Sequence, residues 1–162
     1  MKAIINMVCY VLLIWKCSNT VYSYLMMCFI SLLALISIED AISMKIDKLL
    51  SLILLAIGTV TSFFVPSGCF WKIIIFAGII ALVMYLFSVK SKEAVGKGDV
   101  ICVTAATLCF TFNNVFSMMI YTLLASLVFG IVQLAMKKIN TKQGMPFAPF
   151  IVLGIFLTLI FI

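Results

Sequence analysis

Two aspartates, Asp40 and Asp99, stand where apolar segments of the sequence meet short polar connections. Asp99 belongs to the stretch EAVGKGDV, in which Gly96 and Gly98 flank Lys97 directly before an apolar run. Ionisable side chains at membrane depth are costly and usually face a cavity or a partner, so they are candidates for function. Two carboxyl groups that approach closely tend to share one proton. Such a pair can hydrolyse a peptide bond, because one carboxylate activates a water while the protonated carboxyl polarises the scissile carbonyl.

The rest of the sequence predicts the helices that must position these carboxyl groups. Of the 162 residues, 66% are hydrophobic and 10% are charged, whereas soluble domains are about 45–50% apolar and about 25% charged. Five apolar runs reach the roughly 17 residues that a spanning helix needs, and two are shorter. The runs are 3–15, 20–38, 49–65, 70–89, 100–112, 115–136 and 146–162. We therefore expect an all-α, polytopic membrane helix bundle with six or seven transmembrane helices.

The domain organisation follows from the same runs. We expect one membrane-embedded domain over residues 1–162, with a short N-terminal hydrophobic segment over 1–20 and a core over 21–162. The N-terminal run has no site of the kind that signal peptidase cleaves. The sequence has no histidine and no CxxC pair, so we expect neither a metal site nor a cofactor.

The eleven lysines predict the orientation in the lipid bilayer. With a cytoplasmic N-terminus, nine lysines fall in inner connections and only Lys16 and Lys72 in outer ones, as the positive-inside rule requires. This distribution explains the net charge of +6 without nucleic acid as a partner. Acidic residues do not drive orientation, yet all five fall on the inner side: Glu39, Asp40, Asp47, Glu93 and Asp99.

The depth of the two aspartates can be estimated from helix geometry. The run 100–112 gives about 20 Å of helix against a hydrocarbon core of about 30 Å. We therefore expect this helix to run from about 93 to 113, with Asp99 six residues in and Asp40 at similar depth on the same side. An N-terminal cap is the alternative role for Asp99. Asp40 would end a helix and oppose its dipole, so capping does not explain it, whereas Asp47 is typical of a helix start.

Three segments resemble a known family. GKGDV is similar to the GxGD motif of intramembrane aspartyl proteases, specifically the type IV prepilin peptidases and the related archaeal preflagellin peptidases. SIEDAISMKIDKLL resembles the family's first aspartate segment, with Asp47 where a proline is usual. GMPFAPFIVLG resembles the family's PFGPFLALG, with Ala148 in place of glycine. The resemblance covers residues 21 to 162.

The resemblance implies an intramembrane aspartic endopeptidase of the plasma or inner membrane, with Asp40 and Asp99 catalytic and an active site facing the cytoplasm. The implied substrate is a prepilin-like protein (a pilin, pseudopilin or flagellin-like precursor) whose short basic leader precedes a hydrophobic helix. Pro146, Phe147 and Pro149 would line or support the site, although proline also suits helix initiation alone. The CxxC-bearing loop of the larger, N-methylating members is missing, which indicates a minimal, peptidase-only form.

Two questions stay open at the level of sequence. Lys97 and its neighbours would repel a basic leader, and Glu39, Asp47 and Glu93 are candidates for offsetting that repulsion. The alternatives to a peptidase are a non-catalytic scaffold of a pilus or secretion machine and a proton-coupled transporter. A transporter would place its acids near the midplane in repeated halves with broken helices, and this sequence has no internal repeat.

Overall fold

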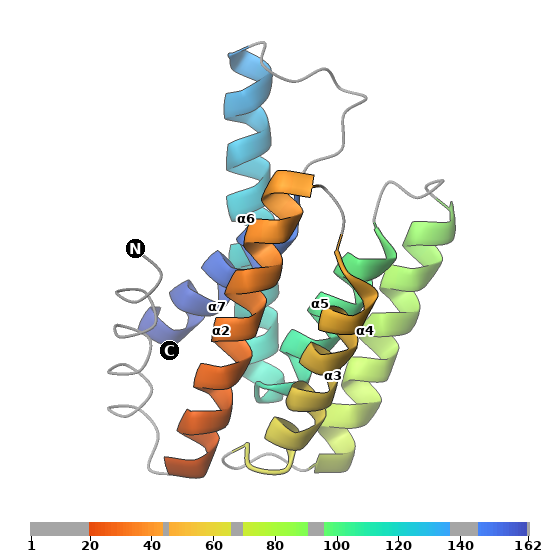
Figure 1. The fold of residues 1–162 in the computed structure, drawn as a ribbon, viewed down its shortest axis with the longest axis vertical. Coiled ribbons are helices and arrows are strands. Elements are labelled where there is room, and N and C mark those ends of the chain that lie inside the picture. Colours follow the sequence, from red (N-terminus) through yellow and green to blue (C-terminus); the bar gives the residue numbers. More distant parts are fainter. Residues whose placement is uncertain (1–19, 44–45, 66–69, 91–95, 137–145, 162) are drawn as a thin grey trace.

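The computed structural model describes residues 20–43, 46–65, 70–90, 96–136 and 146–161. These residues form the following helices (Figure 1): α2 (Thr20–Ser43), α3 (Lys48–Ser62), α4 (Phe70–Lys90), α5 (Lys97–Leu108), α6 (Phe112–Ala135) and α7 (Ala148–Phe161). The chain is an all-α membrane helix bundle, as its apolar runs predict. The expected N-terminal segment lies outside the described residues.

The helices are shorter than several of the apolar runs. Among the described residues, three helices are long and apolar enough to cross a membrane: Val21–Ser43, Phe70–Lys90 and Phe112–Gln133. The runs at 49–65 and 146–162 give shorter apolar helices than expected, since α3 and α7 have 15 and 14 residues. For α3 the reason is local: the Asp47 side chain caps the start, accepting a hydrogen bond of 3.1 Å from the Leu49 amide, and the helix gives way to a turn after Ser62.

The expected boundaries of the fifth helix are also wrong. Instead of running from about 93 to 113, α5 has 12 residues, with Gly96 as its N-cap and Cys109 as its C-cap. Gly96 has an extended backbone (φ −62°, ψ 144°), so the helix does not continue before Lys97. Asp99 therefore lies in the first turn of α5, nearer the helix start than the sequence predicts.

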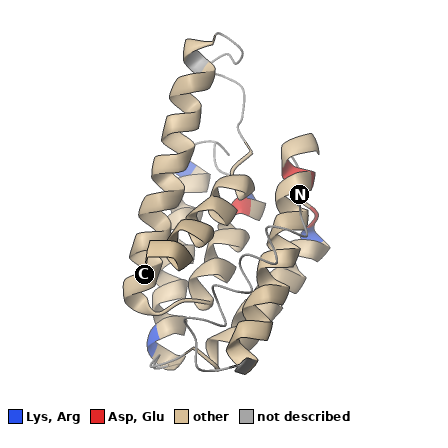
Figure 2. Cartoon of the chain, turned by 90° about the vertical axis from the view of Figure 1, so that its left-hand side faces the viewer, with Lys and Arg blue, Asp and Glu red and all other residues tan. Residues whose placement is uncertain are grey.

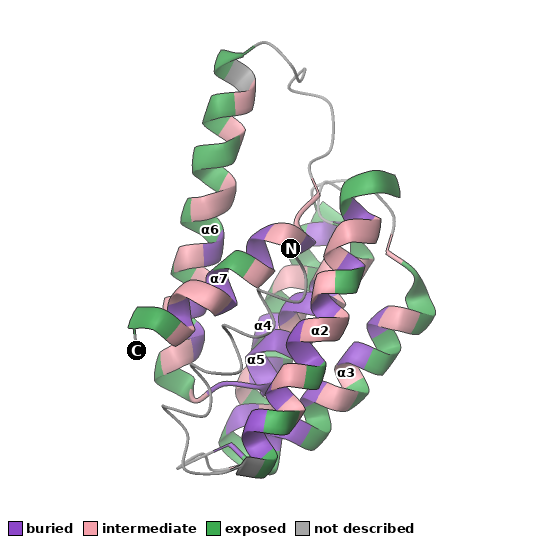
Figure 3. Ribbon diagram, turned by 60° about the vertical axis from the view of Figure 1, so that its left-hand side comes forward, coloured by how far each residue is buried: buried purple, intermediate pink, exposed green. Residues whose placement is uncertain are grey.

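The short α5 forms the centre of the bundle. It packs against α3 and α4 and contacts α7, and seven of its twelve residues are buried. Figure 3 shows buried residues along α5 and the inner face of α2, while the outer faces of α4 and α6 are largely exposed. Those exposed faces carry large apolar side chains such as Leu86, Leu127 and Ile131, as expected where a helix meets lipid. A helix too short to cross the bilayer is thus enclosed by longer ones.

Consecutive helices run in opposite directions, which gathers the acidic residues at one end. The C-terminal ends of α2 and α4 lie beside the N-terminal ends of α3 and α5 (Figure 1). Figure 2 shows the described acidic residues in the same half of the molecule. Lys90 stands in the last turn of α4 at this end, whereas Lys72 stands near the start of α4 at the other end.

Close contacts hold the central helix in place. At the end of α5 away from Asp99, the Tyr22 hydroxyl of α2 donates a buried hydrogen bond of 2.8 Å to the Cys109 carbonyl. Between α3 and α5, a Cβ at Gly58 would lie 2.8 Å from the Ala105 carbonyl oxygen. Glycine at this position lets the two backbones approach closely, as small residues commonly do between membrane helices.

Gly58→Ala is expected to lower the free energy of unfolding by about 1–3 kcal/mol, because the added methyl group overpacks a contact with rigid backbone. Gly78→Ala provides a matched control, since a Cβ at Gly78 would meet nothing within 4 Å. The control should be neutral or stabilise by up to about 1 kcal/mol through helix propensity. Thermal unfolding of both variants in detergent tests the difference, and equal midpoints would contradict the close contact between α3 and α5.

Candidate functional site

Asp40 lies in the last turn of α2 and is 5% exposed. Its Oδ2 atom accepts a hydrogen bond of 3.2 Å from the backbone amide of Ala148, the first residue of α7. The first amides of a helix have no partner within the helix, and the positive end of the helix dipole favours a carboxylate there. Asp40 opposes the dipole of its own helix but caps the start of another. The sequence gives no sign of this contact, because its partners are 108 residues apart.

The segment containing Pro146, Phe147 and Pro149 begins α7. The Phe147 carbonyl accepts hydrogen bonds from the amides of Phe150, at 3.0 Å, and Ile151, at 3.4 Å. Pro149 lies in the first turn, where its missing N–H removes no hydrogen bond from the helix. The two roles weighed from the sequence, helix initiation and support of the site, are thus compatible, since the helix start presents the Ala148 amide to Asp40.

Asp99 is the third residue of α5 and is half-buried. The N-cap position is Gly96 rather than Asp99. The Asp99 amide donates to the Gly96 carbonyl at 3.1 Å, and its position in the first turn suits the helix dipole. A Cβ at Gly96 would lie 3.2 Å from the Asp99 Oδ2 atom, and a Cβ at Gly98 would lie 2.9 Å from the Cβ of Ile46. The two glycines therefore leave room for the carboxyl group and for the connection between α2 and α3.

The structure brings Asp40 and Asp99 to one cavity, although they are 59 positions apart in sequence. Both line one open cavity of about 530 Å³, and they lie close enough for the charge of Asp40 to act on Asp99. The other lining residues are Ile46, Lys48, Ser51, Gly96, Lys97, Gly98 and Ile101. Two aspartates and two lysines thus face a single cavity at the end of the bundle.

Sequence reasoning missed several of the lining residues. Ile101 follows Lys97 by four residues, so helical spacing could have placed it on the same face of α5. Lys48 and Ser51 belong to the first turn of α3, and the Ser51 hydroxyl donates to the Lys48 carbonyl at 2.9 Å. Nothing in their local sequence distinguishes them from other residues at a helix start.

The acidic residues suggested for leader binding have different surroundings. Asp47 is exposed and caps α3, which confirms its interpretation as a helix-start acid. Glu39 is half-buried next to Asp40, but it is not among the described residues that line the cavity. Glu93 lies outside the part of the chain that the structure describes.

Comparison with known proteins gives one match. The model of the type IV leader peptidase family matches residues 27–134, which include Asp40 and Asp99 and end before the segment at 146–149. No curated protein and no solved structure matches the chain. The matched region spans two thirds of the chain, from α2 to α6.

The free energy of unfolding of Asp40→Ala is expected to be about 1–3 kcal/mol lower than that of Asp40→Asn. The reason is that alanine leaves the buried Ala148 amide without its acceptor. Both substitutions remove the carboxylate charge, and asparagine retains an oxygen that can accept the hydrogen bond. Thermal unfolding of the two variants in detergent isolates the hydrogen bond from the charge. If their midpoints coincide, the contact between α2 and α7 does not contribute to stability.

Proposed function

Because the chain belongs to the type IV leader peptidase family, we propose that it is an intramembrane aspartic endopeptidase. It removes the short basic leader from a prepilin-like precursor by hydrolysing one peptide bond. The active site faces the cytoplasm, and the substrate enters with its hydrophobic helix in the same bilayer. Asp40 and Asp99 are the catalytic residues of this proposal.

A single observation carries the proposal: the two carboxyl groups line the same cavity at one end of the bundle. A family match alone gives a peptidase, whereas two interacting carboxyl groups give it a means of hydrolysis without another nucleophile. In the proposed reaction, the pair shares one proton. The ionised carboxyl removes a proton from water as the water attacks the scissile carbonyl, and the protonated carboxyl polarises that carbonyl. The pair then delivers a proton to the leaving amine.

Several features of the chain support specific parts of this mechanism. The Ala148 amide fixes the orientation of the Asp40 carboxyl, and a fixed orientation lowers the cost of reaching the reactive geometry. The missing side chain at Gly96 gives the Asp99 carboxyl room to lie there, since a Cβ at Gly96 would be 3.2 Å from the Asp99 Oδ2 atom. The cavity is open, so water and an extended segment of substrate can reach both aspartates.

The cytoplasmic orientation rests on the distribution of lysines. Lys48, Lys90 and Lys97 stand at the end of the bundle that holds Asp40 and Asp99, and Lys72 stands at the other end. Cytoplasmic connections carry an excess of lysine. The cavity is also lined by Lys48 and Lys97, which repel a basic leader. In this proposal the leader is attracted by three acids: Glu39, Asp47 and Glu93.

Asp40→Asn and Asp99→Asn are each expected to lower the rate of leader removal by about 10²–10⁴-fold or more, because each removes one partner of the acid–base pair. The measurement is co-expression with a prepilin-like protein from the same genome, with leader removal followed by gel shift. Gly78→Ala serves as a control that folds and cleaves normally, and all variants must reach the membrane at equal levels.

Each outcome of this experiment bears on a different part of the proposal. Cleavage that persists without either aspartate would exclude the carboxyl pair as the catalytic group. If the unaltered chain cleaves no candidate precursor, the non-catalytic scaffold becomes the better interpretation.

The combined variant Glu39→Gln, Asp47→Asn and Glu93→Gln is expected to raise KM for a leader-bearing substrate by roughly 3- to 30-fold with little change in kcat. Exposed ion pairs contribute about 0.2–1 kcal/mol each, and the effect should weaken as salt is added. Asparagine is as good an N-cap as aspartate, so α3 keeps its start. Lys72→Gln, which removes a charge at the opposite end of α4, is the matched control. An unchanged KM would remove these acids from leader binding.

A further inference from the structure

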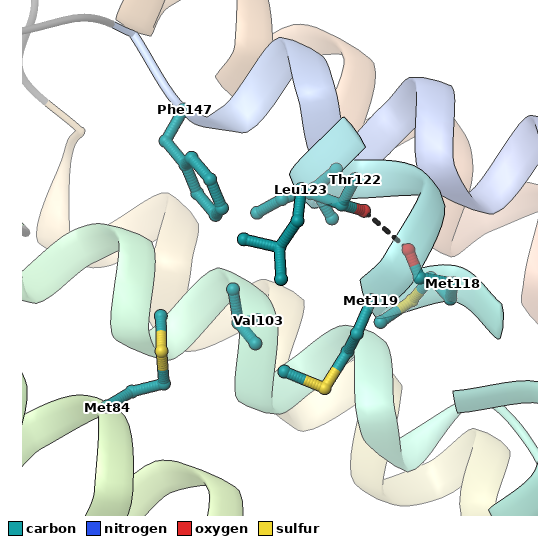
Figure 4. Close-up of a pocket in the computed structure, with 8 residues that line it drawn as sticks. Met84, Val103, Met118, Met119, Thr122, Leu123 and Phe147 are labelled. Carbon is teal, nitrogen blue, oxygen red and sulfur yellow. Dashed lines mark hydrogen bonds between the residues drawn. The ribbon is translucent and has the colours of Figure 1, made fainter. Parts of the chain in front are cut away.

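A second, smaller pocket lies between α4, α5, α6 and the start of α7, with a volume of about 100 Å³. Figure 4 shows Leu123 of α6 pointing into it between Phe147 and Val103. Met84, Met118 and Met119 supply much of the remaining wall. None of the described residues that line it is charged.

The pocket is formed in part by the elements that carry or bind the two aspartates. Val103 follows Asp99 by four residues, on the same face of α5 and about 6 Å further along the helix axis. On the other side, Phe147 directly precedes Ala148, whose amide binds Asp40. The elements that position the two carboxyl groups therefore also form the wall of this pocket.

The chemistry of the wall selects an apolar occupant. Among the described residues that line the pocket, Thr122 has the only hydroxyl, and this hydroxyl already donates to the Met118 carbonyl at 2.8 Å (Figure 4). The volume of about 100 Å³ is smaller than a cavity of about 150 Å³ that holds benzene. It therefore suits one aliphatic side chain better than a large aromatic one. Methionine side chains adapt their shape, so the pocket can follow small differences between occupants.

We infer that this pocket receives one apolar side chain of the polypeptide substrate, from the first residue after the scissile bond. The inference rests on the proposed function. In a precursor whose basic leader is followed by a hydrophobic helix, the first apolar side chains come directly after the cleaved bond. With that bond at Asp40 and Asp99, an apolar pocket begins at Val103, one helical turn along α5 from Asp99. The size of the pocket then limits which residue can occupy that position.

Leu123 allows the pocket to be filled with little effect on folding, because its side chain is 57% exposed at the pocket's edge. Leu124 is the matched control: it is 53% exposed but lines a separate groove between α6 and α7. The experiment compares the unaltered chain, Leu123→Trp, Leu123→Ala and Leu124→Trp. Each is given precursors that differ only in the first residue after the bond, which is alanine, leucine or tryptophan. Equal thermal midpoints for the two tryptophan variants exclude a difference in folding.

Leu123→Trp is expected to lower cleavage of the leucine precursor relative to the alanine precursor by about tenfold or more, since one or two methylene groups in a pocket discriminate by that much. Leu123→Ala should shift the preference among precursors toward the tryptophan precursor. Leu124→Trp should show the same preference as the unaltered chain. If Leu123→Trp slows all precursors equally, or matches Leu124→Trp, the pocket is not a substrate site, and lipid or simple packing explains it. If the unaltered chain cleaves nothing in an Asp99-dependent way, the proposed function itself fails.

Discussion

The contact between the Asp40 carboxyl and the first amide of α7 is the interaction on which the site depends. In an apolar environment, an unpaired carboxyl group and an unpaired amide are both costly to bury. Joining Asp40 to Ala148 satisfies both groups and links two helices far apart in sequence. The same contact fixes the Asp40 carboxyl at the cavity, so that a requirement of folding also orients a group suited to hydrolysis.

The position of α5 provides the other half of the site. This helix has only 12 residues, and it is stable at the centre of the bundle because longer apolar helices enclose it. Tyr22 binds the carbonyl of its C-cap, and Gly58 allows α3 to pack closely along its middle. These contacts leave the first turn of α5 at the cavity, where Asp99 lies half-buried.

The two hollows beside the aspartates differ in chemistry because they lie at different levels of the bundle. The larger cavity is at the end, where helix starts and connections bring lysines and glycines together with the carboxyl groups. The smaller pocket is one turn further along α5, where side chains of four helices meet and are nearly all apolar. Water and polar groups suit the first, and an apolar side chain suits the second.

The sequence by itself determined the fold class and the order of the helices, because membrane helices must be long apolar runs. It also identified Asp40 and Asp99 as candidate site residues, because charged residues within such runs are rare. It also determined that Asp47 begins a helix, since capping is a local property. The sequence placed Asp99 too far into its helix. The estimate of helix length assumed that every helix spans the bilayer, and it overlooked the cap at Gly96. Only the tertiary structure decided that Ala148 binds Asp40 and that Ile46 packs on Gly98. Such contacts depend on how distant segments meet in space, and hydropathy and spacing along one chain do not encode that meeting.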